Sequence, residues 1–133
     1  MKEIQWENEV ITISPEAQKA ANLYGKACRY ADEGFFDEAI ALADEIGEIN
    51  FRLRLVSKDE LKIYIASKQA EVGQVEEALK VAQTIVESHY QSAARYYVAL
   101  ACVSLKQFDK ARELAQTVEI TEMRDRVLAK IPE

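Results

Sequence analysis

The chain has 133 residues, of which 23 are acidic and 17 basic, so its formal net charge is -6 at pH 7. This acidic balance excludes nucleic acid and anionic membranes as expected partners and favours neutral or basic proteins, because an average negative field repels phosphate groups. No apolar run approaches the roughly 20 residues that a membrane helix needs, and the first residues lack a secretory apolar segment, so we expect no membrane insertion and a soluble, cytoplasmic protein.

The N-terminal arm, residues 1–14, is rich in β-branched residues such as Val10 and Ile11. Such residues suit an extended backbone better than a helix. The only tryptophan of the chain, Trp6, lies in this arm, and we expect it to anchor the arm on the first helix pair. Contact with a partner protein is the alternative role of this side chain.

Serines mark where three helices begin. Ser14 precedes a proline, while Ser57 and Ser88 are each followed three residues later by Glu or Gln, which is the pattern of a capping box. Thr121 gives a weaker start signal. Together with apolar residues at helical spacing, these caps predict helices at residues 15–33, 58–72, 89–105 and 121–131.

A seven-residue pattern occurs three times, as EGFFDEA, VGQVEEA and LKQFDKA. The patterns end at Ala39, Ala78 and Ala111, and these intervals of 39 and 33 residues are typical of stacked helix pairs. Apolar spacing after the start of each pattern predicts the second helix of each pair, at residues 35–47, 74–87 and 107–118.

The turn inside each pair falls at Gly34, Gly73 or Lys106. Glycine suits the left-handed backbone that ends many helices, because it has no Cβ. Lys106 must either accept strain in that conformation or leave it.

Residues 49–56 fit two structures. Ile49, Phe51 and Leu53 alternate with polar residues, as in a strand, but the apolar residues between 46 and 56 also fit a helical period. We favour a helical turn.

The predicted fold class is all-α. We expect one domain over residues 1–133, an α-α superhelix in the form of a right-handed solenoid of about three helix pairs with a C-terminal capping helix. Its parts are the arm at 1–14, the pairs at 15–47, 58–87 and 89–118, and the cap at 121–131.

The helix pairs resemble tetratricopeptide-type repeats over residues 20–131. Each has a small residue in its first helix, a turn, an aromatic or apolar residue two positions further on, and then alanine. The bulky aromatic that this family usually carries late in the second helix is replaced here by Ala43, Ala82 and Ala115, and the closing proline is missing. The resemblance implies a concave groove, lined by the first helices, that holds a peptide.

Carried over position by position, the resemblance places eight residues in this groove: Tyr24, Cys28, Ile63, Tyr64, Ser67, Tyr96, Tyr97 and Leu100. Four of the six tyrosines of the chain are among them. Tyrosine offers a large apolar ring and a hydroxyl, which suits an interaction surface. The alternative is that these rings pack between neighbouring helices.

The sequence shows no catalytic chemistry. It has one histidine, His89, no metal-binding motif and no phosphate-binding loop, so we expect no catalytic residue, cofactor or metal. Cys28 and Cys102 lie in helical patterns and are expected to be buried, reduced thiols.

We therefore expect a non-catalytic module that binds a neutral or basic peptide or protein segment. One alternative is a small acidic secretion chaperone, since chaperones of bacterial type III secretion resemble this chain in size and charge. Another is a structural subunit that stacks through its end helices, on another protein or on itself.

Overall fold

The computed structural model describes residues 2–6, 9–13, 15–46, 49–51, 54–56 and 58–132. Within these residues the chain forms seven α-helices and two antiparallel hairpins. The helices are α1 (Pro15–Asp32), α2 (Phe36–Glu45), α3 (Lys58–Glu71), α4 (Val75–Gln83), α5 (Ser88–Ser104), α6 (Phe108–Ala115) and α7 (Thr121–Ala129). The predicted all-α class is confirmed, and every predicted helix is present.

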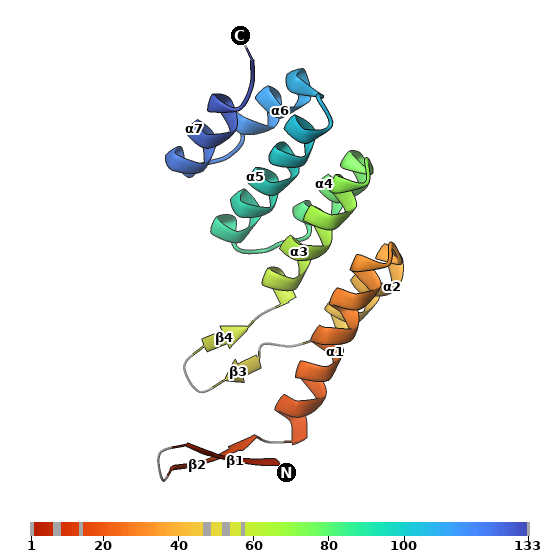
Figure 1. Cartoon of the computed structure of the whole chain (residues 1–133), viewed down its shortest axis with the longest axis vertical. Coiled ribbons are helices and arrows are strands. Elements are labelled where there is room, and N and C mark those ends of the chain that lie inside the picture. The colour runs from red at the N-terminus through yellow and green to blue at the C-terminus, as the bar shows by residue number, and fades with distance from the viewer. Residues whose placement is uncertain are drawn as a thin grey trace.

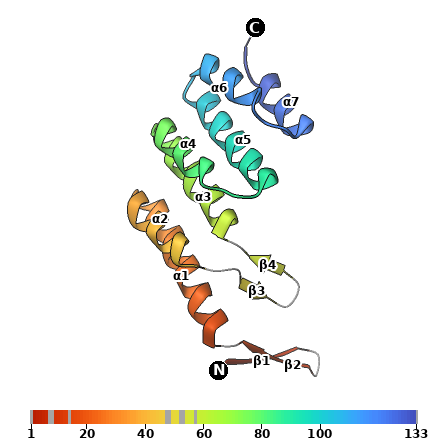
Figure 2. The same cartoon turned by 180° about the vertical axis from the view of Figure 1, so that it is seen from behind.

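The helices form a linear stack of pairs. The first helices α1, α3 and α5 contact one another in order, and α2, α4 and α6 each pack on the first helix of their own pair, while α7 covers α5 and α6. In Figures 1 and 2 the pairs follow one another along the long axis, from the N-terminal to the C-terminal end. The contacts thus join mainly helices that are neighbours in the chain. The helical repeat and the right-handed superhelix remain predictions.

Two hairpins flank the first helix pair. Strand β1 (Lys2–Trp6) pairs with β2 (Glu9–Ile13), and β3 (Ile49–Phe51) pairs with β4 (Arg54–Val56). The N-terminal arm is thus extended, and the anchoring role expected of Trp6 lies outside the described side chains.

The helical turn favoured for residues 49–56 is wrong. The alternating period was the better guide, because apolar residues at every second position suit a pleated strand. Pairing of β3 with β4 also gives the backbone groups hydrogen-bond partners that a single helical turn would leave open.

Alanines are fully buried in both helices of every pair. The alanines at matching positions of the three pairs are all at 0% exposure: Ala27 and Ala39, Ala66 and Ala78, Ala99 and Ala111. A methyl side chain lets two helix backbones approach closely without leaving a void. Ala43, Ala82 and Ala115, each four positions further along the second helix, are also fully buried.

The second helices end two to four residues before the predicted ends. Two threonines account for this in α4 and α6, because Thr84 Oγ1 donates to the Val81 carbonyl and Thr117 Oγ1 to the Leu114 carbonyl, each at 2.7 Å. A hydroxyl that bonds the carbonyl three residues back competes with the continuing helix.

The predicted capping box at Ser88 is not formed. Ser88 is the first residue of α5, the cap position is Glu87, and no side chain caps this end. The Gln91 side chain instead donates to the Ile85 carbonyl at 3.2 Å. Thr121 is likewise the first residue of α7 and not its cap, while Ser14 and Ser57 lie outside the described residues.

All three turns adopt the same left-handed conformation. The φ angles are 89° at Gly34, 94° at Gly73 and 62° at Lys106. In the third turn Gln107 N donates to the Cys102 carbonyl at 2.8 Å, and the first two turns have the equivalent bond. Lys106 therefore keeps the common turn geometry and accepts the backbone strain.

Lys106→Gly is expected to raise the free energy of unfolding by about 0.5–1 kcal/mol, because relief of left-handed strain exceeds the extra entropy of glycine in the unfolded chain. Chemical denaturation of both proteins measures the difference. Gly73→Lys, the reverse change at the equivalent turn, should destabilise the fold. Equal stability of Lys106→Gly and the wild type would contradict the strain.

Ala78→Leu is expected to lower the free energy of unfolding by roughly 1–3 kcal/mol, because it overpacks the crossing of α3 and α4. Gln83→Leu, an exposed change on the same helix, is the control and should have little effect. Thermal melting of the two variants compares them, and an unchanged melting temperature for Ala78→Leu would show that the crossing is not close.

Candidate functional site

A groove of about 430 Å³ lies along the three first helices of the stack. Tyr24 of α1 lies at one side, and α3 and α5 contribute the rest of the wall. The residues that line it are Tyr24, Glu60, Ile63, Tyr64, Ser67, His89, Tyr90, Ala93 and Tyr97. The α3 members are spaced at positions i, i+3, i+4 and i+7, so they share one face of the helix.

The groove brings five of the eight residues expected there together: Tyr24, Ile63, Tyr64, Ser67 and Tyr97. The remaining three do not line it. Tyr96 is only 8% exposed and belongs to the core, while Cys28 and Leu100 are partly buried and pack against core residues. Tyr96 and Tyr97 differ because adjacent helix positions point about 100° apart.

Four residues of the groove were not expected from the sequence: Glu60, His89, Tyr90 and Ala93. Helical spacing could have predicted them, because Glu60 lies on the same helix face as Ile63, and Ala93, Tyr90 and His89 lie on the same face as Tyr97. The Tyr90 hydroxyl donates to Glu60 Oε1 at 3.5 Å, and the rings of His89 and Tyr90 meet edge to face at 5.8 Å. The hydrogen bond of Tyr90 with Glu60 joins the start of α5 to the start of α3.

Tyr64 links the first two helix pairs at the edge of the groove. Its hydroxyl donates to Asp32 Oδ1 at the end of α1, and this hydrogen bond raises the pKa of Tyr64 to about 12, with burial and the charge of Asp32 adding to the shift. Lys68 Nζ lies 3.8 Å from the same carboxylate oxygen and 5.6 Å from the Tyr64 ring centroid. The Tyr64 hydroxyl is therefore engaged within the protein.

Both cysteines are free thiols; Cys102 is buried and Cys28 partly buried. Burial raises the pKa of each thiol, and the nearby Asp32 raises that of Cys28 further. For Cys102, Lys110 partly opposes the effect of burial. A thiol with a raised pKa is protonated at neutral pH and is a weak nucleophile.

The described part of the chain holds no three His, Cys, Asp or Glu side chains grouped as a metal ion would require. None of its helices is both long and apolar enough to cross a membrane. Comparison of the chain with models of protein families, with curated proteins and with solved structures finds no match. Its function is therefore inferred from the surfaces of the fold.

Asp32→Asn is expected to lower the pKa of Tyr64 from about 12 towards the ordinary value of 10, because it removes the carboxylate that accepts the phenol proton. In the wild type the pKa of Tyr64 is higher in the folded state than in the unfolded state. The hydrogen bond therefore stabilises the fold fully below pH 10, and this contribution is lost as the pH rises from 10 to about 12. NMR titration of the tyrosine ring carbons measures both proteins. Asp37→Asn should leave Tyr64 unchanged, and a wild-type Tyr64 that titrates near pH 10 would contradict the bond.

Proposed function

We propose that the chain is a non-catalytic module of the tetratricopeptide type that binds a peptide or protein segment in the groove along α1, α3 and α5. The observation that carries the proposal is the gathering of four tyrosines, Tyr24, Tyr64, Tyr90 and Tyr97, on one groove of successive first helices. Tyrosine rings give contact area at a low cost in conformational entropy, and they are enriched in protein interfaces.

The arrangement of the wall suits an extended segment better than a small molecule. The lining side chains come from three helices that follow one another along the stack, so a segment that crosses them contacts each pair in turn. The same array would serve a secretion chaperone, which is a narrower form of this proposal.

The charge of the whole chain suits a neutral or basic segment. Its formal net charge is -6. An acidic segment would meet this field unfavourably. The free thiols fit a reducing compartment, so we place the protein in the cytoplasm.

Tyr97→Ala is expected to weaken binding of the partner segment by at least about 1 kcal/mol and to leave the fold intact, because the Tyr97 side chain is 42% exposed in the groove. Wild type and variant are used as baits in extracts of the native cell. A peptide from a protein that the wild type alone retains is then synthesised, and its affinity for both baits is measured.

The neighbouring Tyr96→Ala is the matched control. Its ring is 8% exposed, so its loss should lower the free energy of unfolding by roughly 3–5 kcal/mol. Glu113→Ala, at an exposed position of α6, should change neither property. If Tyr97→Ala binds the peptide as tightly as the wild type, the groove is not the binding surface.

A further inference from the structure

Two pockets of matching construction lie along the edge of the stack where first helices turn into second helices. The pocket between the second and third pairs is lined by residues 73–77 together with Gln107 and Lys110. The pocket between the first and second pairs is lined by residues 34–38 with Gln69, Gln74 and Glu77. Each lining residue can be numbered by its distance from the turn residue of its own pair, which is Gly34, Gly73 or Lys106. On this count the residues of the two pockets occupy the same positions, except that Gln69 has no counterpart in the second pocket.

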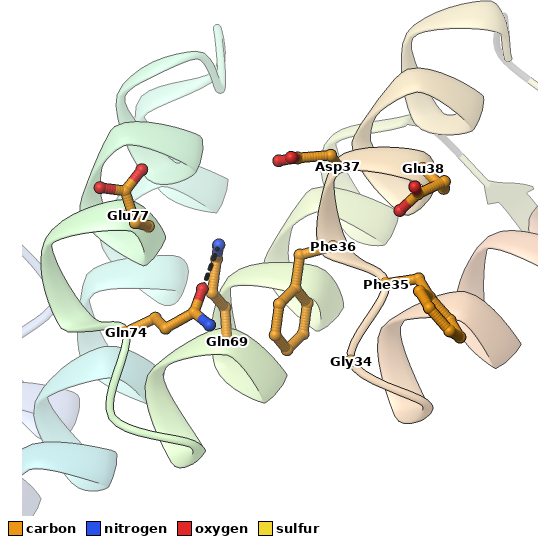
Figure 3. Close-up of a pocket in the computed structure, with 8 residues that line it drawn as sticks. All are labelled: Gly34, Phe35, Phe36, Asp37, Glu38, Gln69, Gln74 and Glu77. Carbon is orange, nitrogen blue, oxygen red and sulfur yellow. Dashed lines mark hydrogen bonds between the residues drawn. The ribbon is translucent and has the colours of Figure 1, made fainter.

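The two pockets differ in one charge. Between the second and third pairs, Lys110 Nζ lies 3.2 Å from Glu76 Oε1 and forms an ion pair across the interface. Between the first and second pairs, Glu77 occupies the position equivalent to Lys110, and Asp37 occupies the position equivalent to Glu76. A carboxylate therefore stands where the next interface has an ammonium group, and Asp37 and Glu77 flank the opening from α2 and α4 (Figure 3).

The floor of the first pocket contains a polar group without a partner. Gln69 of α3 is only 4% exposed, and its Nε2 donates to Gln74 Oε1 at 3.2 Å. Its Oε1 is buried and has no hydrogen-bond partner within the described part of the chain. Burying an acceptor in this way costs free energy, so a ligand that supplies a donor there is stabilised.

The protein's own charges do not neutralise this pocket. Lys80 Nζ lies 3.4 Å from Glu77 Oε1, but both side chains are largely exposed, which makes the pair weak. Among the side chains that the structure describes, no ion pair includes Asp37 or Glu38. The carboxylates are also not grouped as a metal site requires. A larger organic cation that spans them fits this arrangement better.

We propose that this pocket binds an arginine side chain of a partner protein, with the guanidinium group in the place that Lys110 Nζ occupies at the next interface. A guanidinium has five donors in a planar fork, enough for both flanking carboxylates and the Gln69 carbonyl oxygen, whereas an ammonium has three. The pocket measures about 320 Å³. Phe36 lines it, but its ring is buried in the core at 6% exposure, so the carboxylates and the Gln69 amide supply most of the recognition.

This contact is separate from the tyrosine groove. The groove residue Ser67 is only two positions before Gln69 on α3. Two positions on a helix point about 200° apart, so the two side chains face different sides of α3. The pocket therefore goes beyond the proposed peptide groove, and it can be tested without the groove's partner.

The test uses two small probes of the same shape, N-acetyl-arginine amide and its neutral analogue N-acetyl-citrulline amide, added to the full chain and followed by ¹⁵N NMR. The arginine probe is expected to shift the NMR signals of the Gln69 side-chain amide and of the backbone amides of Asp37 and Glu77. The shifts should reach saturation at millimolar concentrations of the probe. The citrulline probe should leave these signals unchanged.

Three variants locate the binding. Asp37→Asn should weaken the arginine probe's affinity by about threefold, the value of one partly exposed ion pair, and Glu77→Lys should abolish binding because it supplies the cation within the chain. Asp109→Asn, the same charge change at the equivalent position of α6, is the matched control and should have no effect.

Absence of shifts at Gln69 would overturn the proposal, as would equal shifts with citrulline or unchanged binding in Glu77→Lys. Tighter binding of N-acetyl-lysine amide than of the arginine probe would overturn the assignment to a guanidinium group. Because Tyr97→Ala leaves this pocket intact, failure of the groove proposal and failure of this one are distinguishable.

Discussion

The close crossing of the two helices within each pair is the constraint on which the rest of the structure depends. Buried alanines such as Ala66 and Ala78 allow this approach, and any larger side chain would separate the backbones. Each pair is therefore a thin, two-layer unit that must cover its apolar faces with the next pair. Repeating the unit aligns the first helices on one side and the turns along one edge, and both candidate binding surfaces arise from this alignment.

Polar contacts between successive pairs differ along the stack. Between the first two pairs, Tyr64 donates to Asp32, and the nearly buried Lys62 lies 3.0 Å from Thr84 Oγ1 and 3.2 Å from Asp44 Oδ1. This buried ammonium has one partner in α2 and one just after the end of α4. It resists sliding of the two segments, because breaking either contact leaves a buried charge with too few partners. The interface of the second and third pairs has instead the ion pair of Lys110 with Glu76.

The tyrosine groove and the acidic pocket lie on different faces of α3 and have different chemistry. The groove offers aromatic area, which suits the proposed peptide segment, whereas the pocket offers carboxylates and an unpaired amide oxygen, which suit the proposed arginine side chain. In both, the negative charge of the chain favours basic partners and raises their rate of encounter. A single partner with an apolar stretch and a nearby arginine could use both surfaces.

The sequence by itself determined the helices and their pairing, because apolar spacing and the alanine and turn positions are local signals that occur in all three pairs. The predicted serine and threonine caps contributed nothing that the described residues confirm. The sequence did not determine the structure of residues 49–56, because their apolar residues fit both a helical and a strand period. Only the pairing of β3 with β4 favours the strand. The family resemblance placed Tyr96 with Tyr97 in the groove, although about 100° of helical rotation separates them and packing buries Tyr96. The facing of Asp37 and Glu77 was decided only by the tertiary structure, because stacking brings together two turns that are distant in the chain, and local sequence patterns carry no information on such contacts.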